Sequence, residues 1–413
     1  MSGLGLDGDA LDLGGGRRRL PDPWRALALD LARRIEVGTL HLTLPDGSRH
    51  TIAGARQAEH RAALHLHRAR ALRRLLFGGV TGFAEAYVDR DWDTPDLPGL
   101  LALALANEAA LGGRLAGIAP LRLVDRLRHG ARANTRRGSR RNIARHYDLG
   151  NAFYAAWLDP SLTYSSALYE RADQDLAGAQ DAKYRRLAGA LGLRPGMRVL
   201  EIGCGWGGFA EIAARDYGCA VTALTISRAQ WAHAARRIQA AGLGERASIE
   251  LRDYRDAQGS YDRIVSIEMV EAVGESRWPA YFAAVRDRLR PGGAAGIQVI
   301  TIDDARFARY RARPDFIQRH IFPGGMLPSP SAFARAATQA GLRIDDAFAF
   351  GGSYARTLAA WRQRFGDAWP SIAAQGFDAR FRRLWEFYLA YCEAGFRAGS
   401  IDVFQYRLGR TGG

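Results

Sequence analysis

The chain has 413 residues, of which 47% are hydrophobic and 24% are charged, and its formal net charge is +15. This composition is typical of a globular protein of two or three domains and excludes a disordered, fibrous or disulfide-stapled chain. Three widely spaced cysteines indicate no disulfide framework and no metal site, so we expect a reducing, cytoplasmic compartment. The positive charge favours an anionic partner, either nucleic acid or an anionic membrane surface.

The first 145 residues divide into three predicted parts. Residues 1–19 carry acids where a secretory signal carries basic residues, and we expect a flexible tail. Residues 20–130 form a small N-terminal domain, with a hairpin predicted at "TLHLTLPDGSRHTI". Residues 131–145 are interpreted as a basic linker, because nine arginines and a single acid lie between Arg122 and Arg145.

The longest apolar run, "LPGLLALALA", begins at Leu97 and ends before Asn107. A membrane span needs about 20 apolar residues, so we expect no transmembrane helix. Together with the neighbouring arginines, the run suits docking on anionic headgroups, although a solvated linker explains the arginines almost as well.

Residues 146–413 alternate between short apolar strands and helices. The predicted strands are "RVLEIG", "AVTALTI", "SIELRD", "DRIVSIE" and "AAGIQVIT", followed by aromatic-rich helices and a last strand, "IDVFQYRL". Such alternation predicts an α/β domain whose parallel sheet is covered on both faces.

A glycine-rich loop follows the first of these strands. Glu201, Gly203, Gly205 and Gly207 form an E-x-G-x-G-x-G pattern. A dinucleotide site would instead show G-x-G-x-x-G and an acid about 20 residues later, which counts against NAD. The pattern resembles the S-adenosylmethionine loop of Rossmann-like methyltransferases, and tight packing of helix on strand is the simpler alternative.

Five separated motifs carry a more specific resemblance. They are "ARHYDLGNAFYAAWLDPSLTYSSALYE", "GCGWGGF", "LTISRAQ", "FIQRHIFPGGMLPS" and "SYARTLAAW". Together they resemble the cyclopropane fatty acyl phospholipid synthases, a family that includes the mycolic acid cyclopropane synthases. The resemblance implies a Rossmann-like class I methyltransferase: a doubly wound, mostly parallel seven-stranded sheet with helical insertions, beside the small N-terminal domain.

The same resemblance implies the activity. A methyl group would pass from S-adenosylmethionine to the cis double bond of an unsaturated acyl chain in a membrane phospholipid, most directly forming a cyclopropane. The enzyme would act at the inner face of the membrane as a peripheral protein. The cofactor-binding residues carried over from the family are Tyr164, Ser165, Glu201, Gly203, Cys204, Gly205, Gly207, Thr225, Gln230 and Tyr254.

Ring closure needs a base, which the resemblance identifies as a bound bicarbonate ion. The residues carried over to hold it are Glu271, Ser166, Gln298, Tyr354 and the backbone amide of Ile300. Ser166 and Gln298 stand where better-known members have Cys and His, and both still donate hydrogen bonds. Glu268 competes with Glu271 as a structural or ligand-contacting carboxylate.

These departures leave the product open between a cyclopropane, a methylene branch and, with a separate reductase, a methyl branch. Other classes fit less well. A nucleic-acid methyltransferase would show an N-P-P-Y-like tetrad or a Pro-Cys nucleophile, and both are missing. A small-molecule amine N-methyltransferase and an inactive lipid-binding module remain as alternatives, as does a homodimer.

Overall fold

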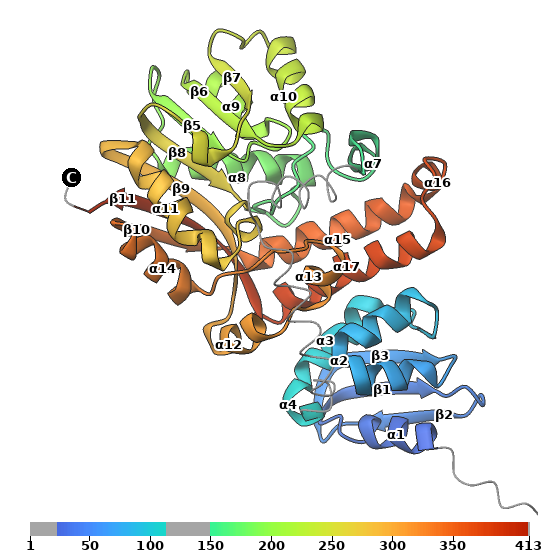
Figure 1. Cartoon of the computed structure of the whole chain (residues 1–413). Coiled ribbons are helices and arrows are strands. Elements are labelled where there is room, and N and C mark those ends of the chain that lie inside the picture. The colour runs from blue at the N-terminus through green and yellow to red at the C-terminus, as the bar shows by residue number, and fades with distance from the viewer. Residues whose placement is uncertain (1–22, 113–148, 412–413) are drawn as a thin grey trace, which may run out of the picture.

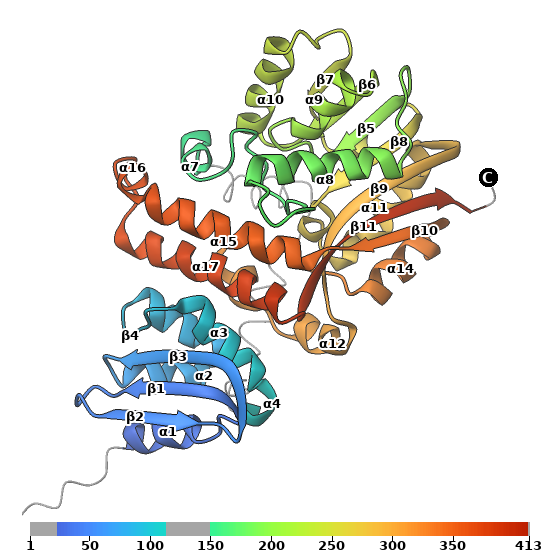
Figure 2. The same cartoon turned by 180° about the vertical axis from the view of Figure 1, so that it is seen from behind.

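The computed structural model describes residues 23–112 and 149–411 (Figure 1). The predicted tail at 1–19 and the basic linker at 131–145 lie outside these ranges. The described chain forms a small N-terminal part and a larger part built around a twisted sheet, and the helices α15 (Gly351–Asp367) and α17 (Ala379–Arg397) lie between the two (Figures 1 and 2).

The N-terminal part is a four-stranded sheet with helices. Its strands are ordered β2 (Arg49–Ala53), β1 (Val37–Thr43), β3 (Arg56–Leu66) and β4 (Trp92–Asp93). The predicted hairpin is confirmed, since β1 and β2 pair antiparallel. The helices are α1 (Pro23–Ala32), α2 (Arg70–Val88), α3 (Leu97–Ala106) and α4 (Glu108–Leu111).

The apolar run after Asp96 is helix α3. It begins where the Asp96 side chain accepts a hydrogen bond from the backbone N–H of Gly99, and it ends after ten residues. Four of its leucines are buried, and the helix packs on β3 and α17; the buried ones are Leu97, Leu100, Leu101 and Leu103. Within the described residues, no helix combines the length and apolar character that a membrane crossing requires.

The larger part contains the seven-stranded, mostly parallel sheet that was predicted. Its strand order is β10 (Leu342–Ala349), β11 (Ile401–Arg410), β9 (Leu289–Ile302), β8 (Tyr261–Ile267), β5 (Arg198–Ile202), β6 (Ala220–Thr225) and β7 (Ala247–Leu251). Only β11 runs antiparallel to its neighbours, β9 and β10. The chain order reverses beside β5, so the carboxyl end of β5 is where a ligand is expected.

Two cores cover the two faces of this sheet. Successive residues of β5 point to opposite sides, so Val199 packs with α8 (Leu176–Ala190), α9 (Gly208–Arg215) and α10 (Arg228–Ala240). Leu200 packs instead with α11 (Trp278–Arg288) and α14 (Pro330–Gln339). This double covering explains why the sheet strands read as continuous apolar runs.

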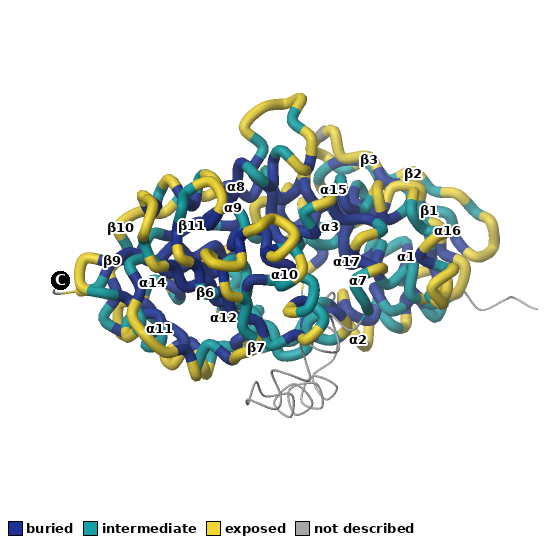
Figure 3. The backbone as a smooth tube through the Cα atoms, turned by 90° about the horizontal axis from the view of Figure 1, so that it is seen from above, coloured by how far each residue is buried: buried dark blue, intermediate teal, exposed yellow. Residues whose placement is uncertain are grey.

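Helix α17 joins the two parts. Arg383 donates hydrogen bonds to the carbonyl oxygens of Tyr87 (2.7 Å) and Trp92 (3.1 Å), and the ring of Phe387 contacts that of Tyr87. Figure 3 shows the buried backbone continuing from the large sheet through α17 to α3. Among the described residues, the remaining elements are the helices α7 (Asn151–Ala155), α12 (Asp304–Ala312), α13 (Phe316–His320) and α16 (Trp369–Ala373) and three short 3-10 turns.

Candidate active site

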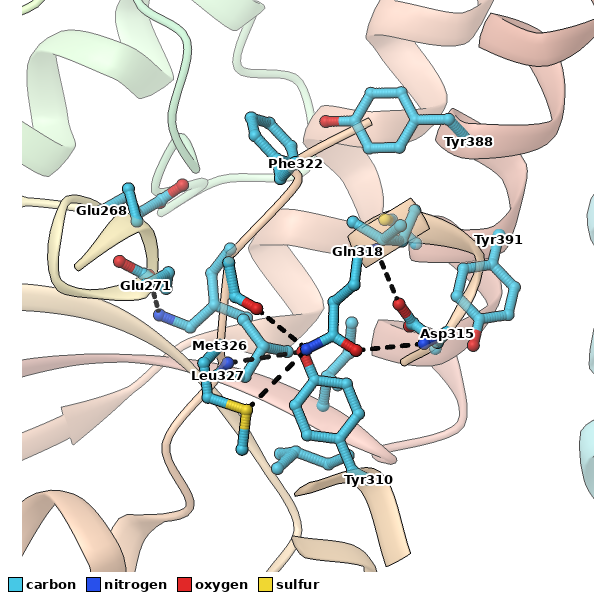
Figure 4. A pocket seen from close by; sticks show the side chains of 18 of the residues that line it. Glu268, Glu271, Tyr310, Asp315, Gln318, Phe322, Met326, Leu327, Tyr388 and Tyr391 are labelled. Carbon is cyan, nitrogen blue, oxygen red and sulfur yellow. Dashed lines mark hydrogen bonds between the residues drawn. The ribbon is translucent and has the colours of Figure 1, made fainter. Parts of the chain in front are cut away.

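A cavity of about 1520 Å³ opens at the carboxyl end of β5. Its walls come from the glycine-rich loop, the ends of β6 to β9, the α12–α13 region, α15 and α17, and its far end is lined by α2 and α3 of the N-terminal part. The cavity therefore spans both parts of the described chain, and Figure 4 shows a portion of its lining.

The glycine-rich loop brings the backbone up to this cavity. Gly203, Gly205 and Gly207 all have left-handed backbones, with φ of 85°, 53° and 87°. Gly203 and Gly205 line the cavity, and a Cβ on Gly205 would meet no protein atom within 4 Å. Gly207 differs from the expectation: it does not line the cavity, and a Cβ there would lie 3.0 Å from Cβ of Ala234, so Gly207 allows α9 to pack on α10.

Glu201 lies buried at the end of β5, on the cavity wall. Burial raises the pKa of its carboxyl to about 8, and the nearby Lys183 opposes that shift. Its Oε2 has no hydrogen-bond partner among the described residues. Because S-adenosylmethionine carries amino and hydroxyl donors, an unpartnered carboxylate oxygen beside a glycine cradle fits that cofactor.

The other predicted cofactor residues also line the cavity. Thr225 donates to Oε1 of Gln230 (3.0 Å), and Tyr254 lies just past the end of β7. Tyr164 shares a hydrogen bond with the hydroxyl of Tyr388 (2.8 Å). Cys204 is buried, and burial raises its thiol pKa well above the usual value, which suits packing rather than nucleophilic chemistry.

Two residues near the cofactor loop were missed by the sequence reasoning. Lys183 is fully buried and donates to Oγ of Ser165 (2.6 Å), and burial lowers its pKa to about 7. Asp253 lines the cavity next to Tyr254 and accepts hydrogen bonds from Arg255. Asp253 stands two residues after the end of β7, and this position could have identified it from the sequence. Ligands of such sheets lie beyond the carboxyl ends of the strands.

The carboxylate of Glu268 is the centre of the second half of the site. Its Oε1 accepts hydrogen bonds from the backbone N–H of Ser166 (2.8 Å) and from Nε2 of Gln298 (2.7 Å). Its Oε2 accepts one from the hydroxyl of Tyr354 (2.7 Å). These donors come from three distant segments, and Glu268 itself follows β8.

Glu271 lies beside Glu268 (Figure 4). Its Oε1 accepts a hydrogen bond from the backbone N–H of Ile300 (2.6 Å), and its Oε2 has no partner among the described residues. Burial, together with the negative charge of Glu268, raises the pKa of Glu271 to about 8. Glu268 has three donors against one for Glu271, so the pair favours charge on Glu268 and a proton on Glu271.

The predicted anion-holding residues are thus close together but arranged differently from the expectation. Ser166 and Gln298 do not line the cavity, because the body of Glu268 lies in front of them. The Ser166 hydroxyl donates to the carbonyl of Ala167 (2.9 Å) and so is turned away from the site. The sequence feature that pointed to Glu268 as well as Glu271 was the motif "EMVE", in which the two acids stand three residues apart.

The "IFPGG" segment closes the cavity on another side. Gln318 of α13 donates to the carbonyl of Gly325 (2.8 Å), and the N–H of Met326 donates to the carbonyl of Glu271 (2.8 Å). These bonds hold Phe322 across the pocket from the two carboxylates (Figure 4).

Aromatic rings line the cavity that holds Glu268, and the Tyr354 hydroxyl contacts its carboxylate. Tyr354 stacks on Phe396 with ring centroids 4.4 Å apart, and Tyr164 contacts Trp361 at 5.2 Å. Phe322 and Tyr388 add two more rings to the wall. A water-poor pocket with many aromatic faces stabilises a positive charge that forms inside it.

Comparison with known proteins agrees with this geometry. The family model "Mycolic acid cyclopropane synthetase" matches residues 134–406. A tuberculostearic acid methyltransferase of Mycobacterium tuberculosis is 42% identical, covering 94% of this chain and 92% of its own. The cyclopropane-fatty-acyl-phospholipid synthase of Escherichia coli is 37% identical, covering 82% and 85%.

Solved structures give the same result. A cyclopropane synthase of Mycobacterium tuberculosis superposes with a TM-score of 0.61 at 32% identity, covering 65% of this chain and 97% of its own. A mycolic acid cyclopropane synthase complexed with SAH and CTAB reaches 0.61 at 31% identity, with the same coverage. A coclaurine N-methyltransferase, with a TM-score of 0.60 at 16% identity over 79% of this chain and 98% of its own, shares the fold alone. The chain therefore belongs to the mycolic acid cyclopropane synthetase family and is an S-adenosylmethionine-dependent methyltransferase.

Proposed function

We propose that the enzyme adds a one-carbon unit to the cis double bond of an unsaturated acyl chain of a membrane phospholipid. The observation that carries this proposal is the cavity, which runs from the glycine-rich loop past Glu268 and Tyr354 to the apolar helices of the N-terminal part. Its volume of about 1520 Å³ exceeds the roughly 300–1,000 Å³ of a pocket for one small ligand. It has room for a cofactor and a long apolar chain together.

The lining suits the chemistry of an alkene. S-adenosylmethionine supplies an electrophilic methyl group, and attack by the double bond places a positive charge on the acyl chain. The aromatic rings beside Glu268 stabilise that charge, and the burial of the site excludes water that would trap it. An amine substrate loses its proton from nitrogen, so it would not need a base directed at the transferred methyl group.

We propose a methylene-branched acyl chain as the main product. The match with the tuberculostearic acid methyltransferase extends over 94% of this chain, and the name of that relative describes addition of a methyl group rather than closure of a ring. In this route a hydride moves between the two former alkene carbons, and loss of a proton from the new methyl group gives the methylene. A separate reductase would convert it to a methyl branch.

A cyclopropane is the second candidate, supported by the similarity to the Escherichia coli synthase over 82% of this chain. It forms when the methyl group loses its proton without a preceding hydride shift, so that the freed electron pair closes the ring. Both routes take the proton from the transferred carbon and therefore use the same base.

We also propose that the mouth of the cavity docks on an anionic bilayer. Leu76, Phe77 and Val80 of α2 are 36–39% exposed, which is unusual for large apolar side chains, and Phe77 and Val80 line the cavity. Arg306 and Arg309 of α12 line it as well. Both are ion-paired with Glu108, and their other guanidinium N–H groups suit phosphate headgroups.

Incubation with S-adenosylmethionine and vesicles of dioleoyl phosphatidylglycerol tests the activity. We expect mass spectrometry to show acyl chains that have gained one CH2, and NMR to show exomethylene protons rather than the upfield protons of a ring. Ring protons would select the cyclopropane instead. Methylation of amines without any change in the lipid would refute the proposal.

A Phe77→Asp variant tests the docking surface. Burial of a Phe side chain is worth roughly 2 kcal/mol, so vesicle binding should weaken more than about tenfold in a flotation assay. Leu251→Asp is the matched control, because Leu251 is equally exposed, at 39%, but lies outside the cavity lining. Equal binding by the two variants would remove this surface from the proposal.

A further inference from the structure

The Glu268 carboxylate lies among the donors that the family resemblance assigns to a bicarbonate ion. The N–H of Ser166, Nε2 of Gln298 and the hydroxyl of Tyr354 all donate to it, at 2.7–2.8 Å. The remaining expected donor, the N–H of Ile300, is bonded to Glu271 at 2.6 Å. Each donor already has a carboxylate acceptor supplied by the chain, so these residues do not fit a bicarbonate ion.

The backbone at Glu268 shows that this placement is specific. Its φ is 50°, a left-handed conformation that favours glycine and costs a larger residue about 1–3 kcal/mol. Glu268 directly follows β8, and its N–H donates to the carbonyl of Gln298 in β9 (2.8 Å). This hydrogen bond holds the backbone in that conformation. This bend directs the side chain into the cavity, towards Tyr354.

The two oxygens of Glu268 have different surroundings. Oε1 accepts two hydrogen bonds and is turned towards the buried Ser166 and Gln298. Oε2 accepts one, from Tyr354, which lines the cavity with Glu268. A carboxylate oxygen with a single donor keeps a lone pair with which to accept a proton.

We propose that Glu268 is the enzyme's own general base and that the enzyme works without bicarbonate. This inference rests on the proposed function. A C–H bond of the transferred methyl group breaks and the proton passes to Oε2 of Glu268. The freed electron pair quenches the cation, either as the π bond of the methylene or as the third bond of the ring. Burial raises the pKa of the Glu268 carboxyl, while its hydrogen-bond donors and the nearby Lys183 oppose that shift. The charge of Glu268 adds to the burial that raises the Glu271 pKa, so Glu271 holds the proton of the pair.

Two substitutions separate a built-in base from a bicarbonate site. Glu268→Gln keeps the side-chain volume and removes the base, so turnover to lipid product should fall at least about 100-fold. Glu268→Gly relieves the left-handed backbone and leaves an open space facing the three donors. We expect this variant to melt no lower than the wild type and to regain turnover as bicarbonate is added. Glu245→Gln, at an exposed position, is the matched control.

The assays are run in carbon-dioxide-free buffer and with added bicarbonate. Wild-type turnover should be the same in both, and Glu268→Gln should not respond to bicarbonate because its side chain still fills the space. Wild-type turnover that depends on bicarbonate, or a Glu268→Gln variant that is as active as the wild type, would overturn the inference.

A binding measurement separates this inference from the proposed function. In 13C NMR, labelled bicarbonate should broaden with the Glu268→Gly variant and not with the wild type, while both bind S-adenosylmethionine in calorimetry. If no lipid is modified, the proposed function fails but this comparison still decides the anion site. Bicarbonate binding by the wild type would overturn the inference even if lipid is modified.

Discussion

Replacement of Tyr354 by Phe tests how the site controls the charge of Glu268. The Tyr354 hydroxyl donates to Oε2 of Glu268 at 2.7 Å; Tyr354 is buried and Glu268 is half-buried. A hydrogen bond to a buried charged group is worth about 1.5–3 kcal/mol, and one pKa unit corresponds to about 1.4 kcal/mol. Because the bond stabilises the ionised carboxylate, its loss should raise the Glu268 pKa by about 1–2 units.

The consequence is visible in a pH profile. Glu268 accepts a proton only when ionised, so kcat/KM should fall at low pH, and this acidic limb should move to higher pH by about 1–2 units in Tyr354→Phe. Tyr261→Phe is the control, because that hydroxyl donates to the carbonyl of Gln258 (2.9 Å) and lies outside the cavity lining. An acidic limb that stays at the same pH in Tyr354→Phe would refute the coupling of Tyr354 to the base.

Four further changes have defined outcomes. Glu201→Gln should weaken S-adenosylmethionine binding about tenfold in calorimetry, because the amide nitrogen cannot accept the hydrogen bond that the unpartnered oxygen of Glu201 can accept; unchanged affinity would exclude a cofactor contact. Burial raises the pKa of Glu271 to about 8, so the folded state holds its proton above the range in which the unfolded carboxyl loses it. The free energy of unfolding should therefore drop as pH rises from about 5 to 8, and urea titrations of Glu271→Gln should show a shallower drop. Arg383→Ala removes two hydrogen bonds to the N-terminal part and should lower stability by about 1–3 kcal/mol, measured by thermal melting. Gly207→Ala adds a Cβ at a φ of 87° and 3.0 Å from Ala234, so it should lower the melting temperature while cofactor affinity per folded molecule stays the same.

The sheet of the larger part was largely predictable because its strands are buried on both faces. "RVLEI" and "DRIVSI" are apolar runs bounded by polar or glycine positions, and they became β5 and β8. Strand β10 gave no such signal: Asp345 and Asp346 interrupt "LRIDDAFA", because β10 lies at the edge of the sheet and is mostly exposed. Its presence was inferred only from the family resemblance.

The two halves of the site also differed in how far they could be predicted from the sequence. The cofactor loop is one short stretch whose glycines have a direct backbone meaning, so Glu201, Gly203 and Gly205 could be assigned to the cavity from the sequence. The role of Glu268 depends on a left-handed backbone and on donors that lie 30 to 102 positions away in the chain. Local sequence reasoning placed both acids of "EMVE" near the site but could not decide which of them accepts those donors.

The position of β11 has a consequence for how this protein is made in the cell. The last strand of the chain inserts between β9 and β10, so neither neighbour can complete its hydrogen bonding until residues 401–410 have been synthesised. A product that stops after Ser400 would present the buried, apolar edge of β9 to other chains. Premature termination should therefore yield aggregates and degradation rather than a shortened enzyme, and tags are better attached at the N-terminal end.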